Sequence, residues 1–307
     1  MSDPSPLRLT ERRNPDTANI DTAGPLEIVD LIAAEDAGVP RAVAEARIEI
    51  ARAMELIEEA FRAGGRLLYV GAGTSGRLGV LDASECPPTF GVPPEMVTGV
   101  IAGGYAALVK SIEGAEDDPN QGIAEMDSRK VGRADVVLGI AASGTTPFVR
   151  SALGRAQALG ARTVFLTCSD PPRVLLDTCD VTIVVRTGPE VVTGSTRMKA
   201  GTATKLVLNT LTTGAMIRLG KTYGNLMVDL KATNAKLVDR GERIVMEVAG
   251  VDRAKARQAL DAAAGQVRLA IVIAAKGGSA EAAEALLARH DNHLRPILGS
   301  PPPVEDR

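Results

Sequence analysis

The stretch Arg66-Leu-Leu-Tyr-Val-Gly-Ala-Gly-Thr-Ser-Gly76 joins a short apolar run to a glycine-rich turn. Its apolar residues are continuous rather than alternating with polar ones, which is typical of a strand buried on both faces of a sheet. Glycines allow a tight turn at the end of the run, and the free amides that open a following helix can hold an anion there. The stretch therefore predicts one strand of a parallel sheet that ends at an anion-binding loop.

Four more runs of this kind follow along the chain, and the segments between them, such as residues 147–159, have helical spacing. Strands and helices that alternate at this interval predict an open, doubly wound α/β sheet of about five parallel strands, flanked by helices. The further runs are residues 97–101, 135–141, 162–167 and 181–185.

Helices are expected both before and after the strands in the sequence. An apolar-periodic segment begins at Leu26, and a longer amphipathic helix is expected over residues 40–63, ended by Gly64-Gly65. After the last strand, a long helix is expected over residues 198–219. Four short Ala-rich helices are expected beyond Gly241, at residues 242–249, 252–264, 266–275 and 279–289.

These elements predict three parts of the chain. Residues 1–63 form an N-terminal arm with helices, residues 64–240 form the α/β domain, and residues 241–307 form a small all-α module with a loose Pro-rich tail. A length of 307 residues fits about two domains by an ordinary length prior.

Composition excludes several classes of protein. Apolar residues make up 45% and charged residues 24% of the chain, so it is globular rather than disordered. With 35 basic and 38 acidic residues, no nucleic-acid or anionic-membrane partner is expected. The chain has four Phe, three Tyr and no Trp, so a bound sugar must be held by hydrogen bonds and charge rather than by stacking.

Cysteine and histidine usage points to a reducing compartment and against a metal site. The three cysteines, Cys86, Cys168 and Cys179, fit reduced thiols better than disulfides. No CxxC motif occurs, and both histidines, His290 and His293, lie far from any cysteine. No apolar run reaches the roughly 18 residues that a membrane helix needs, and the polar start lacks the apolar core of a signal peptide. We expect a cytoplasmic protein.

A second hydroxyl-rich loop, Ala141-Ala-Ser-Gly-Thr-Thr-Pro147, follows another buried strand and opens another helix. Two such loops at strand ends of one sheet are expected to converge on one site. Hydroxyls and amides without a Walker lysine suit a phosphomonoester better than a nucleoside triphosphate with magnesium. Two alternatives stay open: the first loop is only a structural turn, or Ser143 and Thr146 only cap a helix.

The first loop also satisfies the letters GxGxxG of a dinucleotide site, at Gly71, Gly73 and Gly76. However, the expected end of the second strand, residues 100–104, reads Val-Ile-Ala-Gly-Gly and contains no acid to bind a ribose. This disfavours a dinucleotide cofactor.

Carboxylates are the expected proton-transfer groups, because both histidines lie near the C-terminus. Glu85 is expected at the end of a helix that Pro87-Pro88 break, among small and apolar neighbours that suit a general acid. Glu116 belongs to an acidic cluster in which Asp117 and Asp118 are expected to be solvated charges.

Seven collinear segments resemble the sugar-isomerase (SIS) domain family and, within it, most closely the N-acetylmuramic acid 6-phosphate etherases. The glucokinase regulatory protein resembles the same family and shares several of these signatures. The Ala-rich C-terminal helices resemble the small ubiquitin-associated-like module of such etherases. The segments are residues 9–14, 71–79, 81–89, 113–117, 139–147, 192–203 and 225–229.

The resemblance implies cleavage of the C3 D-lactyl ether of N-acetylmuramic acid 6-phosphate without a metal or redox cofactor. It implies that Glu85 is the proton donor and Glu116 the second acid–base residue, with the two roles open to exchange. It also implies a homodimer. The implied substrate contacts are Ser75, Ser143 and Thr146 at the phosphate, Thr74 beside Ser75, and Ser195, Thr196 and Lys199 at the sugar or carboxylate.

Two other functions fit the same resemblance. A non-catalytic protein of this family would sense a phosphosugar and regulate a protein partner. An aldose–ketose isomerase would also use a carboxylate base, so the fold does not separate it from an etherase.

Overall fold

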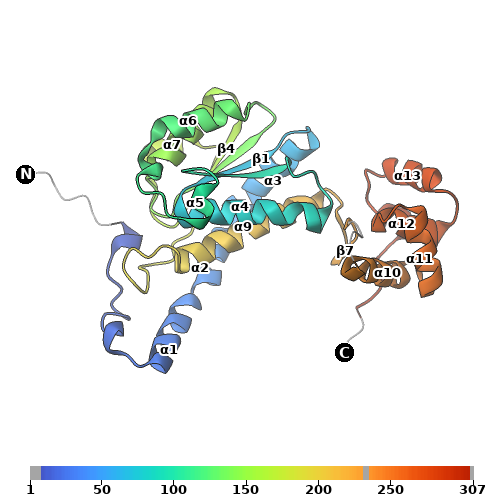
Figure 1. Ribbon diagram of the computed structural model, residues 1–307, viewed down its shortest axis with the longest axis horizontal. Helices are drawn as coiled ribbons and strands as arrows, with labels where there is room; N and C mark the ends of the chain where they lie inside the picture. The colour runs from blue at the N-terminus through green and yellow to red at the C-terminus, as the bar shows by residue number, and fades with distance from the viewer. Residues whose placement is uncertain (1–7, 231–234, 305–307) are drawn as a thin grey trace, which may run out of the picture. The chain divides into compact units, whose positions relative to one another are not determined.

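The structure is a computed structural model that describes residues 8–230 and 235–304 (Figure 1). The chain forms two compact units. The first contains the residues up to Ser84 together with Pro94–Thr212, and the second contains Glu85–Pro93 and the chain from Thr213 onward. The first unit holds the α/β sheet. The second is almost entirely helical.

The sheet of the first unit has five parallel strands in the order β2-β1-β3-β4-β5, as predicted. Every residue of β1 and β3 is buried, which explains why these runs are continuously apolar. The strands are β1 (Leu67–Gly71), β2 (Val97–Ile101), β3 (Val136–Ile140), β4 (Arg162–Thr167) and β5 (Val181–Val184).

Helices cover both faces of the sheet, which confirms the doubly wound architecture (Figure 1). On one face, Leu68, Val137 and Phe165 pack into a buried core with Phe148 and Leu153 of α7. On the other face, α4 approaches β1 so closely that a Cβ on Gly79 would lie 2.8 Å from the Cβ of Tyr69. The helices that lie wholly in this unit are α1 (Pro25–Asp36), α2 (Val39–Glu45), α3 (Arg47–Arg62), α5 (Ala106–Val109), α6 (Pro119–Ser128), α7 (Pro147–Ala158) and α8 (Arg173–Thr178). Helices α4 (Gly73–Phe90) and α9 (Lys199–Arg218) begin in this unit, and their residues from Glu85 and Thr213 onward belong to the second.

The single helix predicted over residues 40–63 is wrong, because the chain turns at Ala46 between α2 and α3. Ala46 leaves the helical region with φ −88° and ψ 14° and is buried. No Gly or Pro marks this break. The turn allows Val39 and Ala42 of α2 and Ile50 of α3 to be buried together with Ala46. Tertiary packing therefore determines where the helix is interrupted.

The helix break predicted at Pro87-Pro88 is also wrong. Helix α4 continues through both prolines to Phe90, and the amide of Gly91 donates to the carbonyl of Pro87 at 3.0 Å. Proline inside a helix costs about 3 kcal/mol. Cys86 and Phe90 are buried on either side of the prolines, so packing offsets that local cost.

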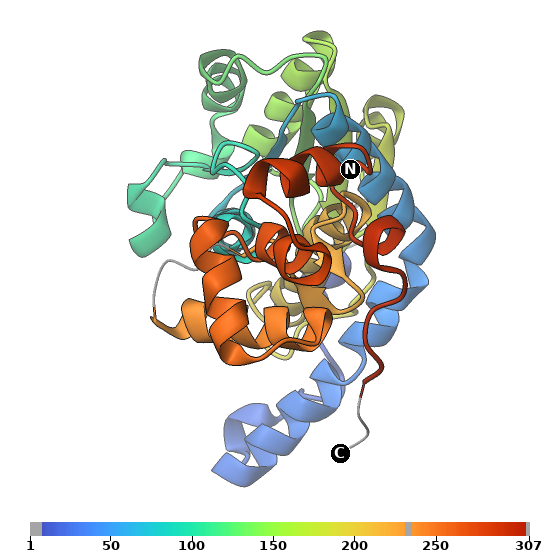
Figure 2. The ribbon, with the colours of Figure 1, turned by 90° about the vertical axis from the view of Figure 1, so that its right-hand side faces the viewer.

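The second unit forms its own apolar core, to which Val245 of α10, Ala256 of α11 and Ile271 of α12 contribute. The four predicted helices are present, and Figure 2 shows them in orange to red, packed around one another. A short hairpin, β6–β7, and a fifth helix were not predicted. The elements are β6 (Thr222–Tyr223), β7 (Leu226–Met227), α10 (Ala235–Ala249), α11 (Arg253–Ala262), α12 (Val267–Lys276), α13 (Ala280–Ala288) and α14 (Arg295–Leu298).

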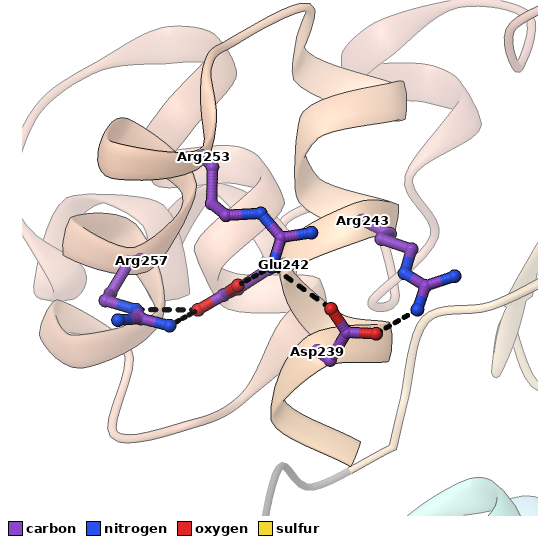
Figure 3. A network of polar contacts seen from close by, with 5 residues as sticks. All are labelled: Asp239, Glu242, Arg243, Arg253 and Arg257. Atoms are coloured by element: carbon purple, nitrogen blue, oxygen red, sulfur yellow. Dashed lines mark hydrogen bonds and ion pairs between the residues drawn. The ribbon is translucent and has the colours of Figure 1, made fainter. Parts of the chain in front are cut away.

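An ionic network joins α10 to α11 in this unit (Figure 3). The side chain of Glu242 is 1% exposed and accepts hydrogen bonds from Arg253 at 2.8 Å and Arg257 at 2.7 Å. Arg253 also bonds Asp239, whose pKa is lowered by Arg243 and Arg253. Since an unpaired buried carboxylate is costly, the arginines allow Glu242 to lie under α11.

Within residues 8–230 and 235–304, no helix is long and apolar enough to cross a membrane. The Pro-rich tail has neither helix nor strand from Pro301 through Val304. The predicted parts of the chain also include residues 1–7, 231–234 and 305–307, which lie outside the described residues.

Candidate functional site

The glycine-rich loop after β1 brings the start of α4 directly against the strand end. A Cβ on Gly71 would lie 2.7 Å from the amide nitrogen of Gly76, and a Cβ on Gly76 would lie 2.6 Å from Ile101. Both positions therefore exclude any larger residue. This close approach gives α4 its start at Gly73 and places Thr74 and Ser75 in its first turn.

The second hydroxyl-rich loop follows β3, the neighbour of β1 in the sheet. The register pairs Gly71 with Ile140, so the two loops leave the sheet at the same level. The order β2-β1-β3-β4-β5 makes the β1/β3 boundary the point where the chain reverses its direction of winding, which is where open α/β sheets bind ligands. The structure thus brings the two predicted loops side by side at this edge of the sheet.

The hydroxyl groups of these loops are available to a ligand. Thr74, Ser75, Ser143 and Thr146 are all half-buried, and none of their hydroxyls forms a hydrogen bond within the described chain. Thr146 is the N-cap residue of α7, yet its side chain makes no capping bond. A role for Thr146 only as a helix cap is therefore contradicted.

A third segment, between β5 and α9, reaches the first loop. The position of a Cβ on Gly201 lies 3.5 Å from the carbonyl oxygen of Thr196 and 3.6 Å from the methyl carbon of Thr74. Thr196 and its neighbour Ser195 are half-buried. The predicted contacts at residues 195 and 196 thus belong to the same region as the glycine-rich loop after β1.

Lys199 occupies a different environment from the other predicted contacts. The residue is 4% exposed, and its ammonium group is bound by the carboxylate of Glu35 on α1. The charge of Lys199 is therefore buried inside the first unit and paired with Glu35 of the same chain.

Glu116 lies in a short 3-10 turn, Ala115–Asp117, that follows β2. A Cβ on Gly103, just beyond β2, would lie 3.3 Å from Ala115, so this turn packs against the end of that strand. Glu116 itself is exposed. Its neighbour Asp118 is not merely a solvated charge, because its carboxylate caps α6 by accepting from Asn120 at 2.9 Å.

Glu85 lies on α4 and belongs to the second unit, whereas Glu116 belongs to the first. The apolar surroundings expected for Glu85 are not observed, because its side chain is exposed. One turn earlier on the same helix, Asp82 is buried and accepts hydrogen bonds from Tyr69 at 2.8 Å and Asn209 at 2.7 Å. These bonds hold α4 to β1 and α9.

Cys168 and Cys179 are not candidate nucleophiles. None of the three cysteines forms a disulfide. Burial raises the pKa of Cys168 to about 12 and that of Cys179 to about 11, so both thiols stay protonated at neutral pH.

Glu190 was not predicted as a functional residue, and it is fully buried. Its carboxylate accepts from the backbone amides of Lys199 and Ala200, both at 2.9 Å, and so caps the start of α9. Burial raises the pKa of Glu190, although these amides and Lys199 favour its charged form. The available signal was a lone acid between Pro189 and Val191, eight residues before the predicted helix.

The similarity of this chain to known proteins covers nearly its whole length. N-acetylmuramic acid 6-phosphate etherases of Edwardsiella ictaluri and Rhodopirellula baltica are each 52% identical to it, over 94% and 95% of this chain and 96% of each relative. The etherase of Gloeothece citriformis is 50% identical over 95% of both chains. This chain belongs to the N-acetylmuramic acid 6-phosphate etherase family.

Two further comparisons agree with membership of the etherase family. The family model described as the N-terminal SIS domain of the glucokinase regulatory protein matches residues 49–157, which include both hydroxyl-rich loops and both glutamates. The solved structure of a phosphoheptose isomerase from Francisella tularensis has a TM-score of 0.51 at 17% identity and covers 64% of this chain and 100% of its own. This second likeness shows the fold alone.

Proposed function

We propose that this chain cleaves the C3 lactyl ether of N-acetylmuramic acid 6-phosphate to N-acetylglucosamine 6-phosphate and D-lactate. The observation that carries the proposal is the similarity to etherases at 49–52% identity over at least 94% of the chain. The reaction belongs to the recycling of cell-wall amino sugars. The two loops at the β1/β3 boundary supply hydroxyls and amides for the 6-phosphate.

The proposed chemistry is an elimination followed by addition of water. In the ring-opened sugar, the C1 aldehyde acidifies the proton on C2. A base removes that proton, an acid protonates the ether oxygen as the C3–O bond breaks, and lactate leaves. Water then adds at C3 of the unsaturated intermediate. Glu116 acts as the base and Glu85 as the acid, and both side chains are accessible in the single chain.

Ser143→Ala is expected to weaken substrate binding while leaving turnover nearly unchanged. A hydrogen bond to the phosphate is made in both the ground state and the transition state, so its loss raises KM rather than lowering kcat. Steady-state kinetics of lactate release measure the split. Ser128→Ala is the control, because its exposed hydroxyl bonds only the carbonyl of Glu125. An unchanged KM in the Ser143 variant removes this residue from the site.

We also propose that the chain forms a homodimer. Helix α1 buries none of its residues, and Figure 1 shows it at the lower left, away from the sheet of its own unit. Leu26 and Val29 on α1 are 75% and 61% exposed. Apolar side chains in such a position are typical of a surface that a second copy covers. Light scattering at micromolar concentration is expected to give the mass of a dimer, and a monomer contradicts the proposal.

A cytoplasmic location is supported by the three cysteines, because none of them forms a disulfide, as is usual in a reducing compartment. A regulatory phosphosugar sensor is the second candidate function, favoured by the match to the glucokinase regulatory protein model.

The deciding experiment supplies N-acetylmuramic acid 6-phosphate to the purified protein and identifies the products. An etherase releases D-lactate together with N-acetylglucosamine 6-phosphate. A sensor binds the phosphosugar in a calorimeter without releasing lactate. An isomerase interconverts an aldose phosphate and a ketose phosphate, so a new ketose without lactate favours it.

A further inference from the structure

The loop between β5 and α9 is held in place by side-chain and backbone contacts from the N-terminal segment. The hydroxyl of Thr17 donates to the carbonyl of Val191 at 2.8 Å. The amide of Gly194 donates to the carbonyl of Thr10 at 3.1 Å. The side-chain amide of Asn14 approaches the carbonyl of Pro189 at 3.5 Å. The residues joined are between 174 and 184 positions apart in the chain.

The N-terminal residues that make these contacts are buried in a segment that is otherwise mostly exposed. Thr10, Asn14 and Thr17 are 0%, 6% and 5% exposed. A buried polar group is costly unless it is hydrogen-bonded. The buried hydroxyl of Thr17 and the carbonyl of buried Val191 therefore satisfy each other, and removing the hydroxyl leaves that carbonyl without its bond.

The far end of the same loop is fixed independently. Glu190 caps α9 through the amides of Lys199 and Ala200, while Glu35 on α1 binds the Lys199 ammonium. The loop is thus anchored at residues 189–194 by the N-terminal segment and at Lys199 by α1.

Ser195 and Thr196 lie between these two anchors. The Ser195 amide donates to the carbonyl of Val192 at 2.9 Å, and the amide of Thr196 donates to that of Gly194 at 2.9 Å. Gly194 has φ +75°, and a Cβ there would lie 3.2 Å from a carboxylate oxygen of Glu11. The turn that presents Ser195 and Thr196 therefore has little room to change shape while the anchors hold.

We propose that Thr17 is a positioning residue that holds Ser195 and Thr196 in their substrate-binding arrangement. The inference rests on the proposed function of those two residues as substrate contacts. Thr17 acts through the carbonyl of Val191 and does not itself touch the substrate.

Thr17→Val tests this directly, because it keeps the shape of the side chain and removes only the hydroxyl. KM is expected to rise about 5- to 10-fold, the effect of losing one hydrogen bond, while kcat stays within about 2-fold. Thr17→Ser, which restores the donor, is expected to recover the wild-type KM. Thr22→Val is the matched control, because its exposed hydroxyl bonds only the nearby carbonyl of Asn19.

A second variant tests the other anchor if Thr17→Val does not fold. Glu35→Gln removes the charge that holds Lys199 and is also expected to raise KM with kcat retained. Glu45→Gln is its control, since Glu45 forms only an exposed pair with Arg41 on α2.

Three results would overturn the inference. These are an unchanged KM in a folded Thr17→Val protein, an equal rise in KM in Thr17→Ser, and a fall in kcat and melting temperature without a change in KM.

Absence of lactate from wild type instead refutes the proposed activity. In that case, calorimetry with the phosphosugar decides the inference. The inference is supported if Thr17→Val binds the phosphosugar more weakly than Thr22→Val does. It is refuted if the two variants bind equally, or if the wild type does not bind at all.

Discussion

Glu116→Gln is expected to lower kcat for lactate release by at least about 100-fold, in the range for loss of one proton-transfer group. The side chain is exposed in a short turn at the end of β2, so the amide fits without repacking. Substrate binding is expected to stay near the wild-type value, because the proposed phosphate contacts lie on other loops. Stopped assays of lactate measure kcat, and calorimetry measures binding.

Asp117→Asn is the matched control for Glu116→Gln. Asp117 is the next residue in the same turn and is also exposed, so the variant makes the same change of charge one position away. It is expected to keep nearly full activity. Loss of activity in both variants, or loss of folding in Glu116→Gln, makes the acidic cluster structural rather than catalytic.

Glu85→Gln is expected to lower kcat by a similar factor of at least about 100, but at a different step. If Glu116 removes the C2 proton and Glu85 protonates the departing ether oxygen, the Glu85 variant still exchanges the C2 proton with solvent. The Glu116 variant does not. Proton NMR of the substrate in deuterated water measures this exchange.

The exchange experiment also tests the assignment of roles. If exchange persists in Glu116→Gln and stops in Glu85→Gln, then Glu85 is the base and Glu116 is the acid. Glu95→Gln is the control for Glu85, because Glu95 is an exposed glutamate outside the family segments. Full activity in Glu85→Gln removes this residue from the chemistry.

The α/β sheet could be predicted because its signals are local. Each strand is a continuous apolar run, as in Leu67–Gly71, and each ends at glycine or hydroxyl residues. The two hydroxyl-rich loops could be predicted to lie close together, because the carboxyl ends of parallel strands lie at the same edge of a sheet. The site residues named from the sequence stay predictions, with the loop geometry in their support.

The errors arose where tertiary packing overrides local preference. Two prolines within α4 and the turn at Ala46 both contradict rules that hold for an isolated segment. Glu190 was missed because its role depends on α9, whose amides it caps. The exposure of Glu85 could not be read from its neighbours in sequence, because burial is set by residues far along the chain.

The long-range contacts of the N-terminal segment could not be predicted from the sequence either. Thr10, Asn14 and Thr17 have no periodicity that marks a helix or strand face, and their partners lie beyond β5. Their burial explains why a segment without regular strands lies in a defined path over the first unit. The boundaries proposed at residues 63 and 240 stay predictions.

The measurement that tests the central claim most directly is the fate of solvent atoms during turnover of N-acetylmuramic acid 6-phosphate in water labelled with heavy oxygen and deuterium. Carboxylate-driven elimination followed by addition predicts heavy oxygen on the C3 hydroxyl and deuterium on C2 of the sugar product, while D-lactate keeps its original ether oxygen. Heavy oxygen in the lactate, or no lactate at all, would contradict the account.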